Sequence, residues 1–162
     1  MRTAILLALG LVTASLSAPL LAAPRLVQEL PGPEAGARKA TEAERKAAIA
    51  SIEGQLKAFK ADDYAAALKY QSSGLKGNFE NAEEFRQAMK RGYPQFARYR
   101  TISYGMSNCD AKGDRLAIQV TLTGEDNITV KAVYLMLREN GEYKVDGVLG
   151  GARVKTQPKD EV

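Results

Sequence analysis

The chain of 162 residues carries 23 basic and 19 acidic side chains, a net charge of +4, one cysteine and no histidine. A single cysteine excludes an internal disulfide, and the missing histidine removes the commonest general base and zinc ligand. The modest charge lacks the dense basic stripe of nucleic-acid-binding domains, so we expect no nucleic-acid partner. We also expect no cofactor and no metal, because the sequence has no phosphate-binding glycine loop and no metal-ligand motif.

The first 23 residues are typical of a secretory signal peptide. Arg2 supplies a positive charge, residues 4–16 form an apolar run, and small residues lead to Ala22 and Ala23. A short charged start, an apolar core and a small-residue exit mark an exported leader. We therefore predict cleavage near residue 23, with the exact site open, and a periplasmic or secreted bacterial protein. A membrane span needs about 20 uninterrupted apolar residues, and this apolar run is shorter. We therefore expect no stable membrane span after cleavage. The alternative is that the run is retained as a membrane anchor.

Three regions follow the leader. Residues 24–40 contain three prolines and two glycines, and we predict a flexible linker there. Residues 41–154 carry helical and then strand-like apolar periodicity, which predicts one folded domain. Residues 155–162 are expected to form a polar tail.

The domain is predicted to begin with a long helix. Thr41 and Glu44 have the spacing of a capping box, in which a hydroxyl and a carboxylate satisfy the first backbone N–H groups. Ile52, Leu56 and Phe59 then recur at helical intervals and predict one apolar face.

Two shorter helices are predicted next. Asp62 or Asp63 caps the second helix, which stops at residues 72–74. Capping explains these adjacent acids better than a catalytic carboxylate pair, because consecutive helical residues do not face one another. After a loop or short strand at residues 75–79, the third helix is expected within residues 81–94.

The apolar period then changes to that of β-strands. Strands are predicted around residues 102–106, 116–122, 128–138 and 143–149. In the first of these, Ile102, Tyr104 and Met106 are expected to share a face. Asn140 and Gly141 predict a tight hairpin between the last two strands. The predicted fold class is α+β, with three N-terminal helices packed on a four-stranded antiparallel sheet.

The predicted strand over residues 128–138 is apolar on both faces. Tyr134 and Met136 mark one face, and Val133, Leu135 and Leu137 mark the other. A strand of this kind is usually covered on both sides. The helices can cover one side, and the other is expected to be covered by a second subunit or by a loop or tail. A homodimer through the sheet is thus one of two open alternatives.

Three segments together resemble a known family. Residues 52–68, 85–105 and 143–149 occur in the order and spacing of an uncharacterised bacterial family of domains of unknown function in the nuclear transport factor two-like superfamily. The stretch from Arg91 to Pro94 is the most specific part. The resemblance implies a cystatin-like α+β cone: a curved sheet wrapped around helices, with a cavity between them. It implies no catalytic residues, although the superfamily includes ketosteroid-isomerase-like and polyketide-cyclase-like enzymes that use Asp, His or Tyr.

Asp146 and Tyr104 are the candidate catalytic residues. If Asp146 lines an apolar cavity, its carboxylate could act as a general base, with the Tyr104 hydroxyl as oxyanion donor. This hypothesis requires both groups to converge in one pocket. The alternative places Asp146 in solvent or in a hydrogen bond with the backbone near Gly147, as for most acids in strands.

A second group of residues suggests ligand binding. Basic and aromatic residues alternate around Arg91 and Tyr93, a pattern that binds anionic or stacking ligands. Tyr134 could add a pocket hydroxyl, and Asp146 a polar contact. The alternative is structural, since cations at a helix C-terminus complement the helix dipole and aromatics pack the corner between helix and sheet.

The sequence favours a non-catalytic function. We expect an exported domain that binds a small apolar or amphipathic ligand, or a protein partner in the cell envelope. The first alternative is a cofactor-free isomerase or cyclase that uses Asp146 and Tyr104. The second is a dimeric module of envelope assembly.

Overall fold

The structure is a computed structural model that describes residues 36–155, with side chains described as far as residue 150. The predicted leader, most of the predicted linker and the tail after residue 155 lie outside the described residues. The elements in chain order are β1 (Arg38–Lys39), α1 (Glu42–Lys60), α2 (Tyr64–Leu68), α3 (Ser73–Lys76), α4 (Ala82–Gly92), α5 (Pro94–Ala97), β2 (Tyr99–Cys109), β3 (Arg115–Gly124), β4 (Ile128–Glu139) and β5 (Glu142–Lys155).

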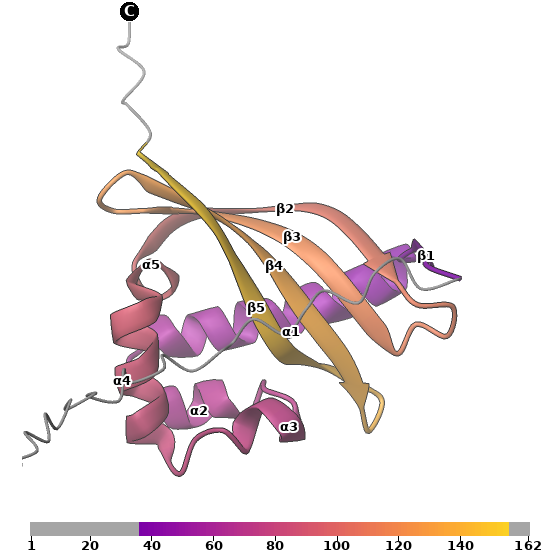
Figure 1. Ribbon diagram of the computed structural model, residues 1–162, viewed down its shortest axis with the longest axis horizontal. Coiled ribbons are helices and arrows are strands. Elements are labelled where there is room, and N and C mark those ends of the chain that lie inside the picture. Colours follow the sequence, from indigo (N-terminus) through magenta and orange to yellow (C-terminus); the bar gives the residue numbers. More distant parts are fainter. Residues whose placement is uncertain (1–35, 156–162) are drawn as a thin grey trace, which may run out of the picture.

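The molecule has two layers. The five strands form one antiparallel sheet in the order β1-β2-β3-β4-β5, so that every strand pairs with its neighbour in the chain. Figure 1 shows all the helices on one face of this twisted, curved sheet, with α1 lying along it and α4 and α5 gathered at one end of α1. The predicted α+β class is confirmed.

The start of α1 confirms the predicted capping box. The Thr41 side chain accepts a hydrogen bond from the backbone N–H of Glu44, and the Glu44 carboxylate accepts one from the backbone N–H of Thr41 at 2.8 Å. Ile52, Leu56 and Phe59 are all buried. Helical spacing therefore identified the buried face of this helix.

The hairpin prediction is also confirmed. β4 ends at Glu139 and β5 begins at Glu142, so that Asn140 and Gly141 form a two-residue turn. Both have positive φ, 52° and 85°, which this tight turn requires and which Asn and Gly adopt readily.

The strand count of four was wrong, because the sheet has five strands. The fifth is β1, only two residues long, which pairs with Asn108 and Cys109 of β2. It lies within the segment that we predicted to be a linker. Two residues cannot show a period, so the sequence pattern could not reveal this strand.

The helix prediction was also incomplete. The described residues contain two further short helices, α3 and α5. Ser72, expected to stop a helix, instead begins α3, since its hydroxyl accepts a hydrogen bond from the backbone N–H of Leu75. Pro94 begins α5 at the first helical position, where a missing N–H does no harm.

Irregularities in two strands changed the predicted faces. In β2, Tyr104 pairs with Val120 but Ser107 pairs with Ile118, so the strand is bulged between them. Met106 is consequently 67% exposed, and the predicted face shared by Ile102, Tyr104 and Met106 is wrong beyond the bulge. A similar shift occurs in β5 around Asp146.

The two faces of β4 differ as expected. Tyr134 and Met136 are buried beneath the helices, whereas Val133, Leu135 and Leu137 on the opposite face are half-buried. In the described part of the chain, the helices cover only the first of these faces (Figure 1). The homodimer through the sheet stays a prediction.

Candidate ligand-binding pocket

A pocket of about 490 Å³ lies at the end of α1 where α2, α4 and α5 meet. It is lined by Phe59, Lys60, Asp62, Tyr64, Met89, Lys90, Tyr93, Pro94, Phe96, Ala97 and Arg98. These residues come from helices and their connecting turns, not from the sheet. Its size falls within the range of small-molecule sites, which begins at about 300 Å³.

Local signals in the sequence position the walls of the pocket. Asp63 caps α2 by accepting a hydrogen bond from the backbone N–H of Ala66 at 2.8 Å. Asn81 caps α4 by accepting from the backbone N–H groups of Glu83 and Glu84. These caps fix where the two helices start, and α4 then presents Met89 and Lys90 to the pocket.

The floor of the pocket is aromatic. The Phe85 side chain is buried between α4 and its neighbours, with its ring 5.7 Å from Phe59 and 6.0 Å from Tyr64. Tyr93 and Phe96 form a second, edge-to-face pair with ring centroids 5.5 Å apart. Ring pairs of this kind are favourable beyond their buried area and stabilise the packing of the aromatic side chains around the pocket.

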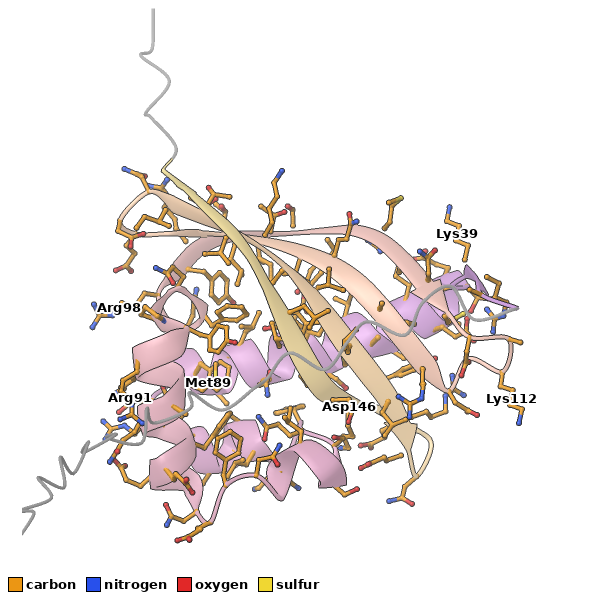
Figure 2. All side chains as sticks on the ribbon, in the orientation of Figure 1. Lys39, Met89, Arg91, Arg98, Lys112 and Asp146 are labelled. Atoms are coloured by element: carbon orange, nitrogen blue, oxygen red, sulfur yellow. The ribbon has the colours of Figure 1, made fainter. Side chains whose placement is uncertain are left out.

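Cations outnumber carboxylates on the pocket wall. Lys60, Lys90 and Arg98 line it, whereas Asp62 is its one acidic residue. The Lys60 ammonium lies 3.6 Å from the ring centroid of Tyr99, a cation–π contact. No ion pair joins the Arg98 side chain to another residue of the described part, and Figure 2 shows it extending outward at the end of α5.

Asp62 is paired with two cations of α4. Its carboxylate lies 2.9 Å from the Lys90 ammonium and 2.7 Å from the Arg86 guanidinium. The hydrogen bonds from Lys90 and Arg86 hold the pKa of the Asp62 carboxyl below its ordinary value. The pKa of the Tyr64 hydroxyl is raised, mainly because burial disfavours the charged phenolate.

The structure does not bring Asp146 and Tyr104 together. Asp146 is half-buried and accepts a hydrogen bond of 2.6 Å from the hydroxyl of Ser72, the residue that caps α3. Figure 2 shows Asp146 near the lower edge of the sheet, away from Arg98 at the end of α5. Tyr104 lies on β2, three strands from β5, which corresponds to about 14 Å across a sheet.

Tyr104 has its own partner. Its hydroxyl donates a hydrogen bond to Glu53 of α1 at 3.3 Å, and burial is the main reason why its pKa is raised. Neither Tyr104 nor Asp146 lines the pocket. The geometry that the enzyme hypothesis requires, one cavity shared by both groups, is therefore not what this fold presents.

The three remaining predicted residues have different surroundings. Tyr93 lines the pocket, but Arg91 does not, and Figure 2 shows Met89 on the inner side of α4 and Arg91 on the outer side. Tyr134 is fully buried, with its ring 6.0 Å from that of Phe96. Its hydroxyl has no hydrogen-bond partner among the described residues.

Sequence reasoning missed most of the pocket. Lys60 and Met89 were not predicted as site residues, and Arg98 was predicted only as one of the basic residues around Tyr93. Asp62 or Asp63 was interpreted as a helix cap. One signal was present: of two adjacent acids only one can cap a helix, so the other was free for a different role. Nothing in the spacing indicated that the turn after α1 would contact α4.

Residues 41–157 match the model of a protein family described as domain of unknown function (DUF4864). The chain belongs to this family. The match covers most of the sequence and contains every residue that lines the pocket of the DUF4864 domain. No curated protein matches the chain. No helix in the described part of the DUF4864 domain is both long enough and apolar enough to cross a membrane.

Proposed function

We propose that this DUF4864 domain binds a small amphipathic anion in the pocket at the end of α1. The observation that carries the proposal is the combination of an aromatic floor with three cations and one carboxylate on the wall. An aromatic or apolar body would lie against Phe59, Tyr93 and Phe96. Its anionic group would be attracted by the cations at the rim.

Arg98 is the cation best placed to receive a ligand. Lys60 already contacts the Tyr99 ring, and Lys90 is paired with Asp62. Arg98 lines the pocket without an ion pair to another described residue. The Arg98 side chain is exposed, so its guanidinium can turn toward an anion bound at the pocket. A guanidinium favours a carboxylate or a similar anion, because its N–H groups match that geometry.

The test compares two probes that differ only in charge. Dansylglycine has an aromatic body and a carboxylate, and dansylglycinamide has the same body without the charge. We expect the chain to bind dansylglycine more tightly, measured as the increase of dansyl fluorescence on titration. Arg98→Gln should weaken dansylglycine binding by about two- to five-fold, the range of a solvent-screened ion pair, and leave dansylglycinamide binding unchanged.

Arg91→Gln is the matched control. Arg91 is also an exposed arginine near the end of α4, but it does not line the pocket. This variant should bind both probes like the unmodified chain. Equal losses in the two variants would contradict the proposal, because they would indicate a general attraction to positive surface.

We also propose that the fold is a nuclear transport factor two-like cone and that the protein is exported. The support for the cone is the curved sheet with α1 along its concave side, and the support for export is the apolar run behind Arg2. Superposition of an experimental structure on superfamily members tests the first proposal. Mass spectrometry of the protein from a periplasmic fraction tests the second. A chain that still begins at residue 1 would contradict cleavage of the leader.

A further inference from the structure

We infer that the Asp62 carboxylate competes with an anionic ligand for the cations of the pocket. Its presence therefore weakens the binding of carboxylate ligands. The inference rests on the proposed function. It concerns the specificity of the pocket: which of its cations are free for a ligand, and which are already occupied by a carboxylate of the chain itself.

The geometry shows a carboxylate in an anion-binding position. One Asp62 oxygen lies 2.9 Å from the Lys90 nitrogen, and the other lies 2.7 Å from a terminal nitrogen of Arg86. Each oxygen thus has its own cation, and Lys90 lines the pocket beside Asp62. The two cations are four residues apart on α4, so they project from the same side of the helix.

Helix capping does not require this carboxylate. Asp63, not Asp62, caps α2. Asp62 has a φ of 56°, a left-handed backbone that most residues avoid but that Asp, Asn and Gly adopt more readily. Asp62 lies in the turn between α1 and α2, and its side chain reaches Arg86 and Lys90 of α4.

The pairing leaves Asp62 able to yield to a ligand. Its side chain is 53% exposed, and those of Lys90 and Arg86 are 46% and 37% exposed. Ion pairs this accessible to water are weak, so the carboxylate can rotate away. A ligand carboxylate that approaches Lys90 must displace Asp62 or remain close to its negative charge, and both effects reduce affinity.

Removal of the charge tests the inference. Asp62→Asn keeps the size of the side chain and tolerates the left-handed backbone. We expect it to tighten dansylglycine binding by about two- to five-fold at low salt and to leave dansylglycinamide binding unchanged. Asp62→Gly, which suits the same backbone, should tighten dansylglycine binding as well and serves as the second variant.

Glu83→Gln is the matched control. Glu83 also pairs with Arg86, at 3.4 Å, but it does not line the pocket. It should leave the affinity for both probes unchanged. If the unmodified chain binds dansylglycine and Asp62→Asn does not bind it more tightly, the inference is overturned while the proposed function stands. If the unmodified chain does not bind dansylglycine more tightly than dansylglycinamide, both the proposed function and the inference about Asp62 are contradicted.

Discussion

The two ends of α1 use their charged residues in different ways. At the N-terminal end, Arg38 and Glu44 form an ion pair at 2.7 Å, and Arg45 donates hydrogen bonds to the backbone carbonyls of Gly105 and Tyr104. We call this the closed end. At the other end, the pocket end, Lys60, Lys90 and Arg98 line a cavity.

The closed end fastens the helix to the sheet. Glu44 pairs with Arg38 of β1 and also completes the capping box, and Arg45 satisfies two carbonyls of β2 near its bulge. Gly113 lies against the Glu44–Arg38 pair and has a φ of 75°. A side chain at this position would meet the Glu44 carboxylate. Arg38, Glu44 and Arg45 are therefore paired within the fold.

The pocket end leaves polar groups available. Its walls are held by aromatic packing, while Arg98 has no ion pair within residues 36–150. The comparison teaches that charge alone does not identify a site in this domain. What distinguishes the pocket end is a cation without an ion pair to another described residue, beside an aromatic cavity.

The largest expected effect comes from a hydroxyl near the closed end. The buried Tyr143 hydroxyl donates a hydrogen bond to the Gly113 carbonyl at 2.6 Å and accepts one from Arg138 at 2.9 Å. Tyr143→Phe removes both hydrogen bonds and leaves the carbonyl of the buried Gly113 without the hydroxyl, so it should lower the free energy of unfolding by about 1–3 kcal/mol, measured by urea denaturation.

Tyr134→Phe is the matched comparison for that substitution. Tyr134 is equally buried, but its hydroxyl has no partner among the described residues. Its removal should leave the free energy of unfolding unchanged or raise it, because an unpaired buried hydroxyl is unfavourable. Equal losses in the two variants would show that hydrogen bonding near the closed end is not what the tyrosine provides.

The second prediction concerns acid. The hydrogen bonds from Arg38 and Thr41 hold the pKa of Glu44 well below its ordinary value of 4.5. A lowered pKa in the folded state means that the stabilisation is complete above pH 4.5 and is lost as the pH falls below it. Glu44→Gln should therefore be less stable at neutral pH and lose less stability on acidification.

Thermal unfolding between neutral and strongly acidic pH measures this difference. Glu42→Gln is the control, since Glu42 lies in the same helical turn and forms no ion pair with another described residue. Its pH profile should follow that of the unmodified chain. Parallel profiles for all three proteins would argue that the Arg38–Glu44 pair does not fasten the closed end.

The smallest effect on stability is expected at the pocket end. Arg98→Gln removes a side chain that is exposed and without an ion pair within residues 36–150, so its free energy of unfolding should stay within about 0.5 kcal/mol of the unmodified value. Its expected effect is on ligand affinity alone. If Arg98→Gln lowered the free energy of unfolding as much as Tyr143→Phe does, the proposed difference between the closed end and the pocket end would be contradicted.

Part of the fold could be predicted because its signals are local. The capping box of Thr41 and Glu44 joins residues three positions apart, and the turn of Asn140 and Gly141 depends on two adjacent residues. Strand alternation identified the buried face of β3 for the same reason. Such patterns survive in any tertiary arrangement that buries the apolar face.

The pocket could not be predicted from the sequence because the contacts that form it are not local. Of the named candidates Asp146, Tyr104, Arg91, Tyr93 and Tyr134, only Tyr93 lines the pocket. The register shift in β5 lies at Asp146, and Ser72 donates a hydrogen bond to its carboxylate from a turn distant in the sequence. A single extra residue in a strand is enough to move a side chain to another face.

The sequence by itself determined the α+β class, the long capped helix, the hairpin and the buried faces of the regular elements. Only the tertiary structure decided which polar groups are paired and which remain free. Asp62 meets Arg86 from 24 residues away, and the pocket collects side chains from four elements. Those contacts depend on how the helices pack, and packing is set by the whole core rather than by any one segment.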